Sequence, residues 1–158
     1  MGLIIKDKIQ SLMVGYPTVS DKYDVEGGLA NETLRFGDLV VAESTGAGKG
    51  YYKKVDATKV DGIVLATNVK LNTTYPADAE GPVTVKGEAF NVLIGGRVAV
   101  ALDSDATASA IVKGADAKLS TAHKLSTTGT AIAGNVSIKF TGFYEMQGTT
   151  IVAEVEVK

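Results

Sequence analysis

The amino-acid sequence predicts an all-β protein, a small β-sandwich or β-barrel with an N-terminal arm. Glycine is frequent, with 18 residues against 3 prolines, and Val, Thr and Ala are common. This composition favours strands and tight turns over a helical bundle. Apolar and polar residues also alternate in several short segments, the pattern of strands with one buried face. Turn residues separate these segments at intervals, which is typical of a sandwich or small barrel.

The overall composition bounds the function. The 158 residues contain 16 basic and 18 acidic side chains, too even a balance for the concentrated basic footprint of a nucleic-acid-binding protein. There is no cysteine, which excludes disulfides and thiolate metal sites. Lys6, Asp7 and Lys8 interrupt the first apolar run, so no signal peptide is predicted, and no run reaches the roughly 20 residues of a membrane span. We therefore expect a soluble protein that binds neither nucleic acid nor membrane.

The N-terminal unit is predicted to cover residues 1–33, before a β domain at residues 34–158. Apolar residues recur at helical spacing in its first half, at Ile5, Ile9, Leu12, Met13 and Tyr16. Two interpretations stay open: a short helix on the protein's own core, or an extended arm that docks on a neighbouring molecule. Pro17 ends either structure, because it disfavours the helical conformation of the residue before it. Residues 18–35 are polar and predict irregular chain, anchored by Tyr23 and Val25.

Strand signals become regular after this segment. Residues 35–42 predict a turn at Phe36-Gly37 that leads into a buried strand, and residues 51–55 predict its returning partner, with a loop at 44–50 between them. Residues 59–66 predict a turn followed by an apolar strand, and residues 69–80 a polar loop.

Residues 83–102 are the organising stretch in this interpretation. The alternation is interrupted at Gly95-Gly96 and resumes after it. A Gly-Gly pair suits a type I′ turn, because both central residues of that turn need positive φ. We therefore predict a central β-hairpin that turns at these glycines.

The C-terminal third is less uniform. Residues 103–125 are compatible with a short helix capped by Asp103 or with a strand around Ile111, and the sequence does not choose between them. Residues 135–144 and 150–157 predict two closing strands, joined by a turn at 146–148. On the last strand, Glu154 and Glu156 are expected on an exposed face, where like charges discourage edge-to-edge aggregation.

The motifs that could carry chemistry are weak. Residues 46–50 (GAGKG) lack the spacing and the hydroxyl residue of a phosphate-binding loop. Residues 103–105 (DSD) begin like a calcium loop, but Ala108 and Gly114 occupy the positions where that loop needs Gly and Glu. His123 is the only histidine, so neither a zinc site nor a histidine-based triad is supported. We predict no catalytic residue, no metal site and no cofactor.

Several segments, taken in their order and spacing, resemble the structural cement (capsid decoration) proteins of tailed bacteriophages. They are residues 6–17 with their Gly-Tyr-Pro, 34–41 with the Phe-Gly turn, 60–66 (VDGIVLA), 74–77 (TYPA), 83–100, and 138–157. The chain departs from that family at residues 103–134, which are longer and richer in Ala and Thr. It also has Thr18 where a second glycine often follows the proline.

This resemblance implies a non-enzymatic virion protein, made in the host cytoplasm, that forms a trimer on the outer capsid surface. Family members bridge neighbouring major capsid proteins near local threefold axes and use their N-terminal region for contact. The residues expected to contact capsid or subunit are Ile5, Ile9, Leu12, Met13, Tyr16, Pro17 and Tyr23.

Two other classes of function stay open. A virion-displayed module that binds carbohydrate or a host surface would need exposed aromatic side chains, and Tyr51, Tyr52 and Tyr75 are the only cluster that the sequence offers. A small β-barrel enzyme is the third possibility, although no catalytic constellation supports it.

Overall fold

A computed structural model describes residues 12–18, 23–44, 50–66 and 83–158 and confirms the all-β fold class. Its longer strands are β1 (Asp24–Ala30), β3 (Leu39–Ala42), β4 (Tyr51–Lys54), β6 (Gly62–Leu65), β8 (Ala89–Ala101), β13 (Ile138–Gln147) and β14 (Thr150–Val157). The two-residue strands are β2 (Leu34–Arg35), β5 (Lys59–Val60), β7 (Val83–Thr84), β9 (Lys118–Leu119), β10 (Leu125–Ser126), β11 (Thr130–Ala131) and β12 (Ala133–Gly134). Within the described ranges, no helix is long and apolar enough to cross a membrane.

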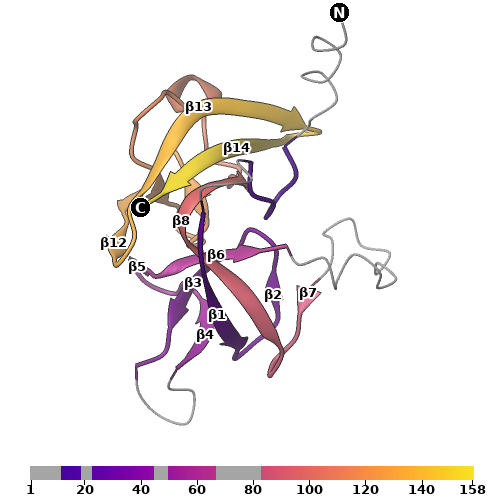
Figure 1. Cartoon of the computed structure of the whole chain (residues 1–158). Coiled ribbons are helices and arrows are strands. Elements are labelled where there is room, and N and C mark those ends of the chain that lie inside the picture. Colours follow the sequence, from indigo (N-terminus) through magenta and orange to yellow (C-terminus); the bar gives the residue numbers. More distant parts are fainter. Residues whose placement is uncertain (1–11, 19–22, 45–49, 67–82) are drawn as a thin grey trace, which may run out of the picture.

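Five strands form a small closed barrel, in the lower half of Figure 1. Around the ring, β1 pairs with β4, β4 with β3, β3 with β6, and β6 with β8. The ring closes because β8 also pairs with β1, from Leu29↔Ala89 to Asp24↔Gly95. Closure leaves these strands without the open edges that a flat sheet would have.

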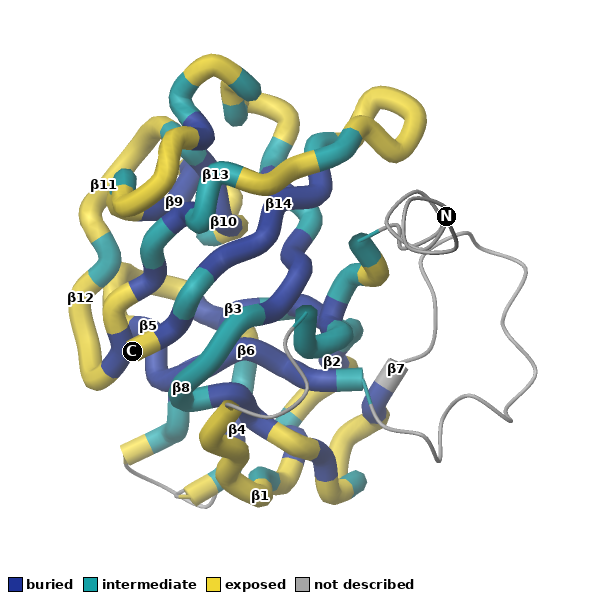
Figure 2. The backbone as a smooth tube through the Cα atoms, turned by 45° about the horizontal axis from the view of Figure 1, so that its top comes forward, coloured by how far each residue is buried: buried dark blue, intermediate teal, exposed yellow. Residues whose placement is uncertain are grey.

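Two hydrophobic cores lie on opposite faces of the barrel wall. One cluster receives side chains from all five barrel strands, among them Val40, Val64 and Phe90, and therefore fills the barrel. The other lies between the outside of the wall and an upper layer that includes β13 and β14, to which Phe140 contributes. Residues 39–42 and 62–65 are continuous apolar runs because alternate side chains enter different cores. Figure 2 shows the buried segments passing through the middle of the molecule, with exposed segments at the loops.

The predicted central hairpin is wrong. Residues 89–101 form one strand, β8, which runs through Gly95-Gly96 without turning back. Up to Gly95 it pairs with β1 and β6, and from Gly96 to Ala101 it pairs with β14. Gly96 has φ 121°, a conformation that glycine adopts without penalty. The glycine pair therefore lies where β8 leaves the barrel and enters the upper layer, a common place for glycine in a bent strand.

Residues 24–30, which were expected to be irregular, form β1 instead. Gly27-Gly28 argued against a strand, because glycine weakens strand interiors. The structure gives Gly28 a packing reason: a Cβ there would lie 2.7 Å from Cδ2 of Tyr52. The ring of Tyr52 occupies that space and meets Phe90 edge-on, with ring centroids 5.8 Å apart.

The other strand predictions between residues 35 and 66 are confirmed. β3 follows the Phe36-Gly37 turn, β4 returns antiparallel to it, and β6 lies within residues 59–66. Of the loop predicted at 44–50, residues 45–49 lie outside the described residues, and so does all of 69–80.

Residues 103–134 contain neither of the two elements predicted as alternatives for residues 103–125, a helix capped by Asp103 or a strand around Ile111. They contain a single 3-10 turn, η2 (Ala108–Ala110), and the short strands β9 to β12. Local side-chain bonds organise this segment: Asp103 accepts from the Ser120 hydroxyl at 2.5 Å, and Asp105 accepts from the Ser126 hydroxyl at 2.6 Å. Short polar side chains that bond locally compete with regular secondary structure, which explains the absence of a longer element between Asp103 and Gly134.

The two closing strands are confirmed, but the turn lies at Gly148-Thr149 and not at the predicted 146–148, because β13 extends to Gln147. β14 pairs with β8 on one side and β13 on the other, so the upper layer continues the barrel sheet. A bulge between Phe140 and Tyr144 includes Gly142 at φ 96°, and it separates the buried start of β13 from its exposed end.

Candidate interaction surface

The described part of the N-terminal segment, residues 12–18, is docked on the upper half of β8. Val14 and Pro17 form isolated bridges with Ala99 and Val98. The Gly15 amide donates to the Ala99 carbonyl at 2.8 Å, and the Gly15 carbonyl accepts from the Ala66 amide at 2.8 Å. This segment is a turn and not part of a helix, since the Tyr16 amide bonds back to the Met13 carbonyl at 3.0 Å.

Gly15 packs against the Phe36-Gly37 turn, so two motifs far apart in the sequence meet here. Gly15 has φ 79°, and a Cβ on it would lie 2.5 Å from Cβ of Phe36. Gly37 has φ 86°, and a Cβ on it would lie 2.6 Å from Cγ1 of Val14. Each glycine thus combines a left-handed backbone with a contact that no side chain permits. We call residues 12–18 with this turn the arm anchor.

Asp38 directly follows the Phe36-Gly37 turn of the arm anchor. Its carboxylate accepts the Arg35 amide at 2.8 Å and lies 3.8 Å from Nζ of Lys54. Burial raises the pKa of Asp38 above its usual 3.8, while the Arg35 amide and the lysine oppose this effect.

The structure spreads the predicted contact residues over two places. Ile5 and Ile9 lie outside the described residues. Leu12, Tyr16 and Pro17 are half-buried in the arm anchor, whereas Met13 is 56% exposed. Tyr23 is separate from them, immediately before β1, and is exposed.

The end of β13 carries exposed apolar side chains that sequence reasoning missed. They are Phe143, Tyr144 and Met146, and Phe143 is 68% exposed. The side-chain amide (Nε2) of Gln147, the last residue of β13, donates to the Leu12 carbonyl at 2.6 Å, so the arm anchor begins beside this strand. The adjacent aromatic pair Phe143-Tyr144 was the available signal, because neighbouring strand residues point to opposite faces.

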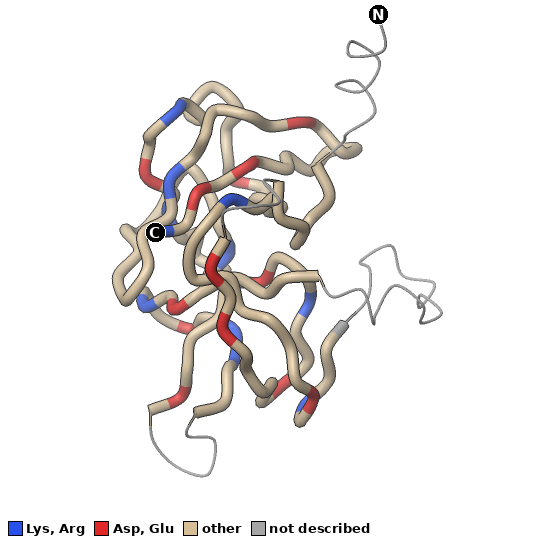
Figure 3. Tube along the Cα trace, in the orientation of Figure 1, with Lys and Arg blue, Asp and Glu red and all other residues tan. Residues whose placement is uncertain are grey.

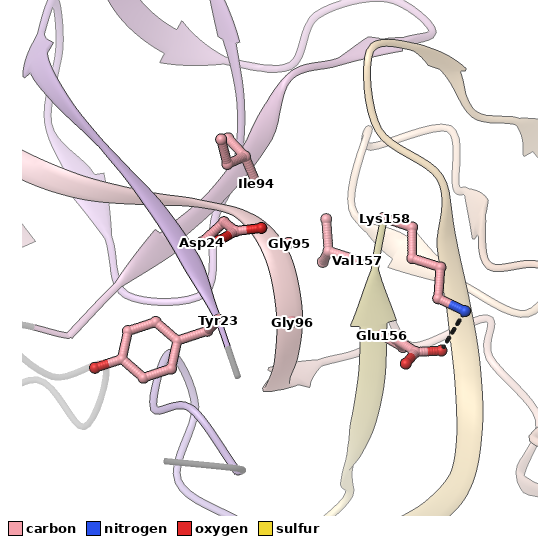
Figure 4. Close-up of a pocket in the computed structure, with 8 residues that line it drawn as sticks. All are labelled: Tyr23, Asp24, Ile94, Gly95, Gly96, Glu156, Val157 and Lys158. Atoms are coloured by element: carbon pink, nitrogen blue, oxygen red, sulfur yellow. Dashed lines mark ion pairs between the residues drawn. The ribbon is translucent and has the colours of Figure 1, made fainter. Parts of the chain in front are cut away.

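A shallow depression of about 490 Å³ lies at the bend of β8. Figure 4 shows Tyr23 and Asp24 on one side of Gly95-Gly96, with Glu156 and Lys158 on the other. Glu156 forms an ion pair with Lys158 at 3.1 Å. The depression is thus lined by a tyrosine, two carboxylates and one amine that is already paired with a carboxylate. This arrangement suits polar contacts.

The tyrosines, glutamate and histidine that the sequence analysis considered for other functions are placed as follows. Tyr52 is buried in the barrel core and therefore does not join Tyr51 at the surface, and Tyr75 lies outside the described residues. Glu154, expected on an exposed face, is only 8% exposed. His123 is half-buried at φ 57° in a turn. Among the described residues, no three His, Asp or Glu side chains gather as metal ligands.

Comparison with known proteins adds no relative: the chain matches no family model, no curated protein and no solved structure.

Proposed function

We propose that the protein is a bacteriophage capsid decoration (cement) protein. In this proposal it binds the outer surface of the head as a homotrimer, bridges neighbouring major capsid proteins and stabilises the shell. The resemblance of the six segments to cement proteins is the starting point. The structural observation that supports it most is the arm anchor, in which Gly15 meets Phe36-Gly37 and fixes the origin of the N-terminal segment.

The physical requirements of such a protein fit this arrangement. A clamp needs a rigid body, which the closed barrel and its two cores supply. It also needs exposed apolar side chains that a partner can bury, and Met13, Phe143 and Met146 are more than half exposed. Several weak contacts made by one linked body reinforce one another, so each contact can be modest. The function requires no reactive group.

Cosedimentation with capsids tests the proposal. The purified protein is mixed with expanded and unexpanded empty shells, and its oligomeric state is measured by analytical ultracentrifugation. We expect a trimer that sediments with shells and raises their resistance to heat or chelators. A protein that binds neither form of shell would refute the proposed function.

The arm contribution is tested by deleting residues 1–11. A longer deletion is unsuitable, because residues 14–17 pair with β8 and the Gly15 carbonyl binds the Ala66 amide. We expect the truncated protein to retain the melting temperature of the full chain and to lose most shell binding. Unchanged binding would show that the predicted contacts of Ile5 and Ile9 are not needed.

A further inference from the structure

Four basic side chains from distant parts of the chain surround a groove of about 370 Å³ on the upper layer. They are Arg97 on β8, Lys113, Lys139 on β13, and Lys158 after β14. Among the residues that the structure describes, Glu156 is the only acidic one that lines the same groove. In Figure 3 the basic segments of the upper layer gather on the side where the chain ends. The groove is thus locally positive on a protein whose net charge is −2.

Two nearby carboxylates, Glu156 and Asp116, offset the four cations only in part. Glu156 is shared between Lys158 at 3.1 Å and Arg97 at 3.8 Å. Asp116, at the margin, pairs with Lys139 at 2.6 Å, while Lys113 forms no ion pair with a described residue. Glu154 is buried and does not line the groove. Exposed ion pairs of this kind are weak, so an incoming carboxylate can compete for the cations.

The groove continues into an open strand edge. At its start, the outer edge of β13 is covered by the chain after Lys113: the Gly114 amide donates to the Phe140 carbonyl at 2.8 Å, and the Ala117 amide to the Ile138 carbonyl at 3.0 Å. From Thr141 to Gln147, no described residue forms a ladder on that edge. Phe143 lines the groove at the point where the cover ends and is 68% exposed.

We propose that this groove and the open edge of β13 dock an extended acidic segment of a partner protein. The segment adds to residues 141–147 as a strand, its carboxylates meet Lys113, Lys139 and Arg97, and an apolar side chain packs on Phe143. Strand addition supplies affinity through the backbone, and the side-chain contacts supply specificity. The inference rests on the proposed function in naming the partner, which is the capsid surface. A single-stranded nucleic acid fits less well, because it lacks the alternating N–H and C=O groups that continue a β ladder, and its phosphates can only accept.

The direct test is an NMR titration of the full-length protein. The probe is an eight-residue peptide of alternating Glu and Val with one central Phe, and the comparison peptide has Lys in place of Glu. We expect saturable shifts of the amides of residues 141–147 with the Glu peptide and at least tenfold weaker binding of the Lys peptide. Equal binding of both peptides, or shifts elsewhere only, would overturn the proposal.

A pair of charge-matched variants makes the test specific. Lys113→Glu with Lys139→Gln alters the groove, whereas Lys86→Glu with Lys118→Gln changes exposed lysines that do not line it. With circular dichroism verifying the fold of each, we expect the groove variant to bind the Glu peptide at least tenfold more weakly and the control variant within twofold of the original. Similar losses in both variants would refute the role of the groove.

Two further outcomes would assign the surface to another occupant and so overturn the proposal. One is tighter binding of an eight-nucleotide thymidine oligomer than of the Glu peptide. The other is concentration-dependent self-association that shifts residues 141–147 without peptide. Shell binding separates this inference from the proposed function: if the original protein and the groove variant bind shells equally, only the inference fails. If the original protein binds no shell, the proposed function fails, and the peptide titration still decides the inference.

Discussion

Replacing Gly15 by alanine should detach or strain the arm anchor. The backbone there has φ 79°, which costs an L-residue about 1–2 kcal/mol. The new Cβ would lie 2.5 Å from Cβ of Phe36, whereas carbon atoms pack at about 3.5–4.0 Å. The segment must therefore move by about 1 Å. Such a shift weakens the hydrogen bonds of Gly15 to Ala99 and Ala66, each 2.8 Å long.

We expect the Gly15→Ala variant to lose about 2–4 kcal/mol of unfolding free energy, the backbone strain plus roughly 1 kcal/mol for each bond lost. Urea unfolding measures this loss, and hydrogen exchange locates it at the amide of Ala66 and at the amide of residue 15, which donates to the Ala99 carbonyl. Gly27→Ala is the matched control, because Gly27 does not have a left-handed φ and a Cβ there meets no atom within 4 Å. Its unfolding free energy should change by less than about 1 kcal/mol.

The reasoning is refuted if both alanine variants unfold at the same urea concentration while the amides of residue 15 and Ala66 keep their protection. That result would mean that the residue-12–18 segment makes no stabilising contact with the Phe36-Gly37 turn.

Three other predictions follow from single contacts. Phe140→Ala should lower the unfolding free energy, measured in urea, by about 3–5 kcal/mol, because this side chain is 2% exposed in the larger core. Phe143→Ala on the same strand should lower it by less than about 0.5 kcal/mol. Equal losses would contradict the placement of the bulge between the two residues. Burial raises the pKa of Asp38 above 3.8, so the folded state holds more protons than the unfolded state above that pH, and stability falls as pH rises through the raised value. Asp38→Asn should remove this fall in stability. If the unfolding free energies of the original protein and of this variant change in parallel from about pH 4 to pH 7, the prediction is wrong. The Ser120 hydroxyl and the Ser104 amide hold the pKa of Asp103 below 3.8, which adds stability that is lost as pH falls. Ser120→Ala should raise the pKa of Asp103 in a carbon-13 NMR titration. An unchanged pKa would exclude the Ser120 hydrogen bond as the cause of the lowered pKa.

Of the apolar residues at helical spacing near the N-terminus, the structure describes Leu12, Met13 and Tyr16. Tyr16 and Pro17 lie on the protein's own β8, and Leu12 lies beside the end of β13. Residues 12–17 therefore form a turn on the protein's own sheet and not a helix. The contact roles predicted for all seven residues, from Ile5 to Tyr23, stay predictions. Alternation could not reveal the basic groove, because Arg97, Lys113, Lys139 and Lys158 meet only after β8, β13 and β14 pair.

Sequence by itself determined the fold class and the strands β3, β4, β6, β13 and β14, because their side-chain periods and flanking turns are local properties. Tertiary structure decided how the strands join. Gly95-Gly96 permits both a tight turn and a bent strand, and pairing with β1, β6 and β14 selects the bend. It also buried Glu154 and built the arm anchor from Gly15 and Phe36-Gly37. Contacts between residues far apart in the chain produce no periodic pattern in the sequence, so only the folded structure shows them.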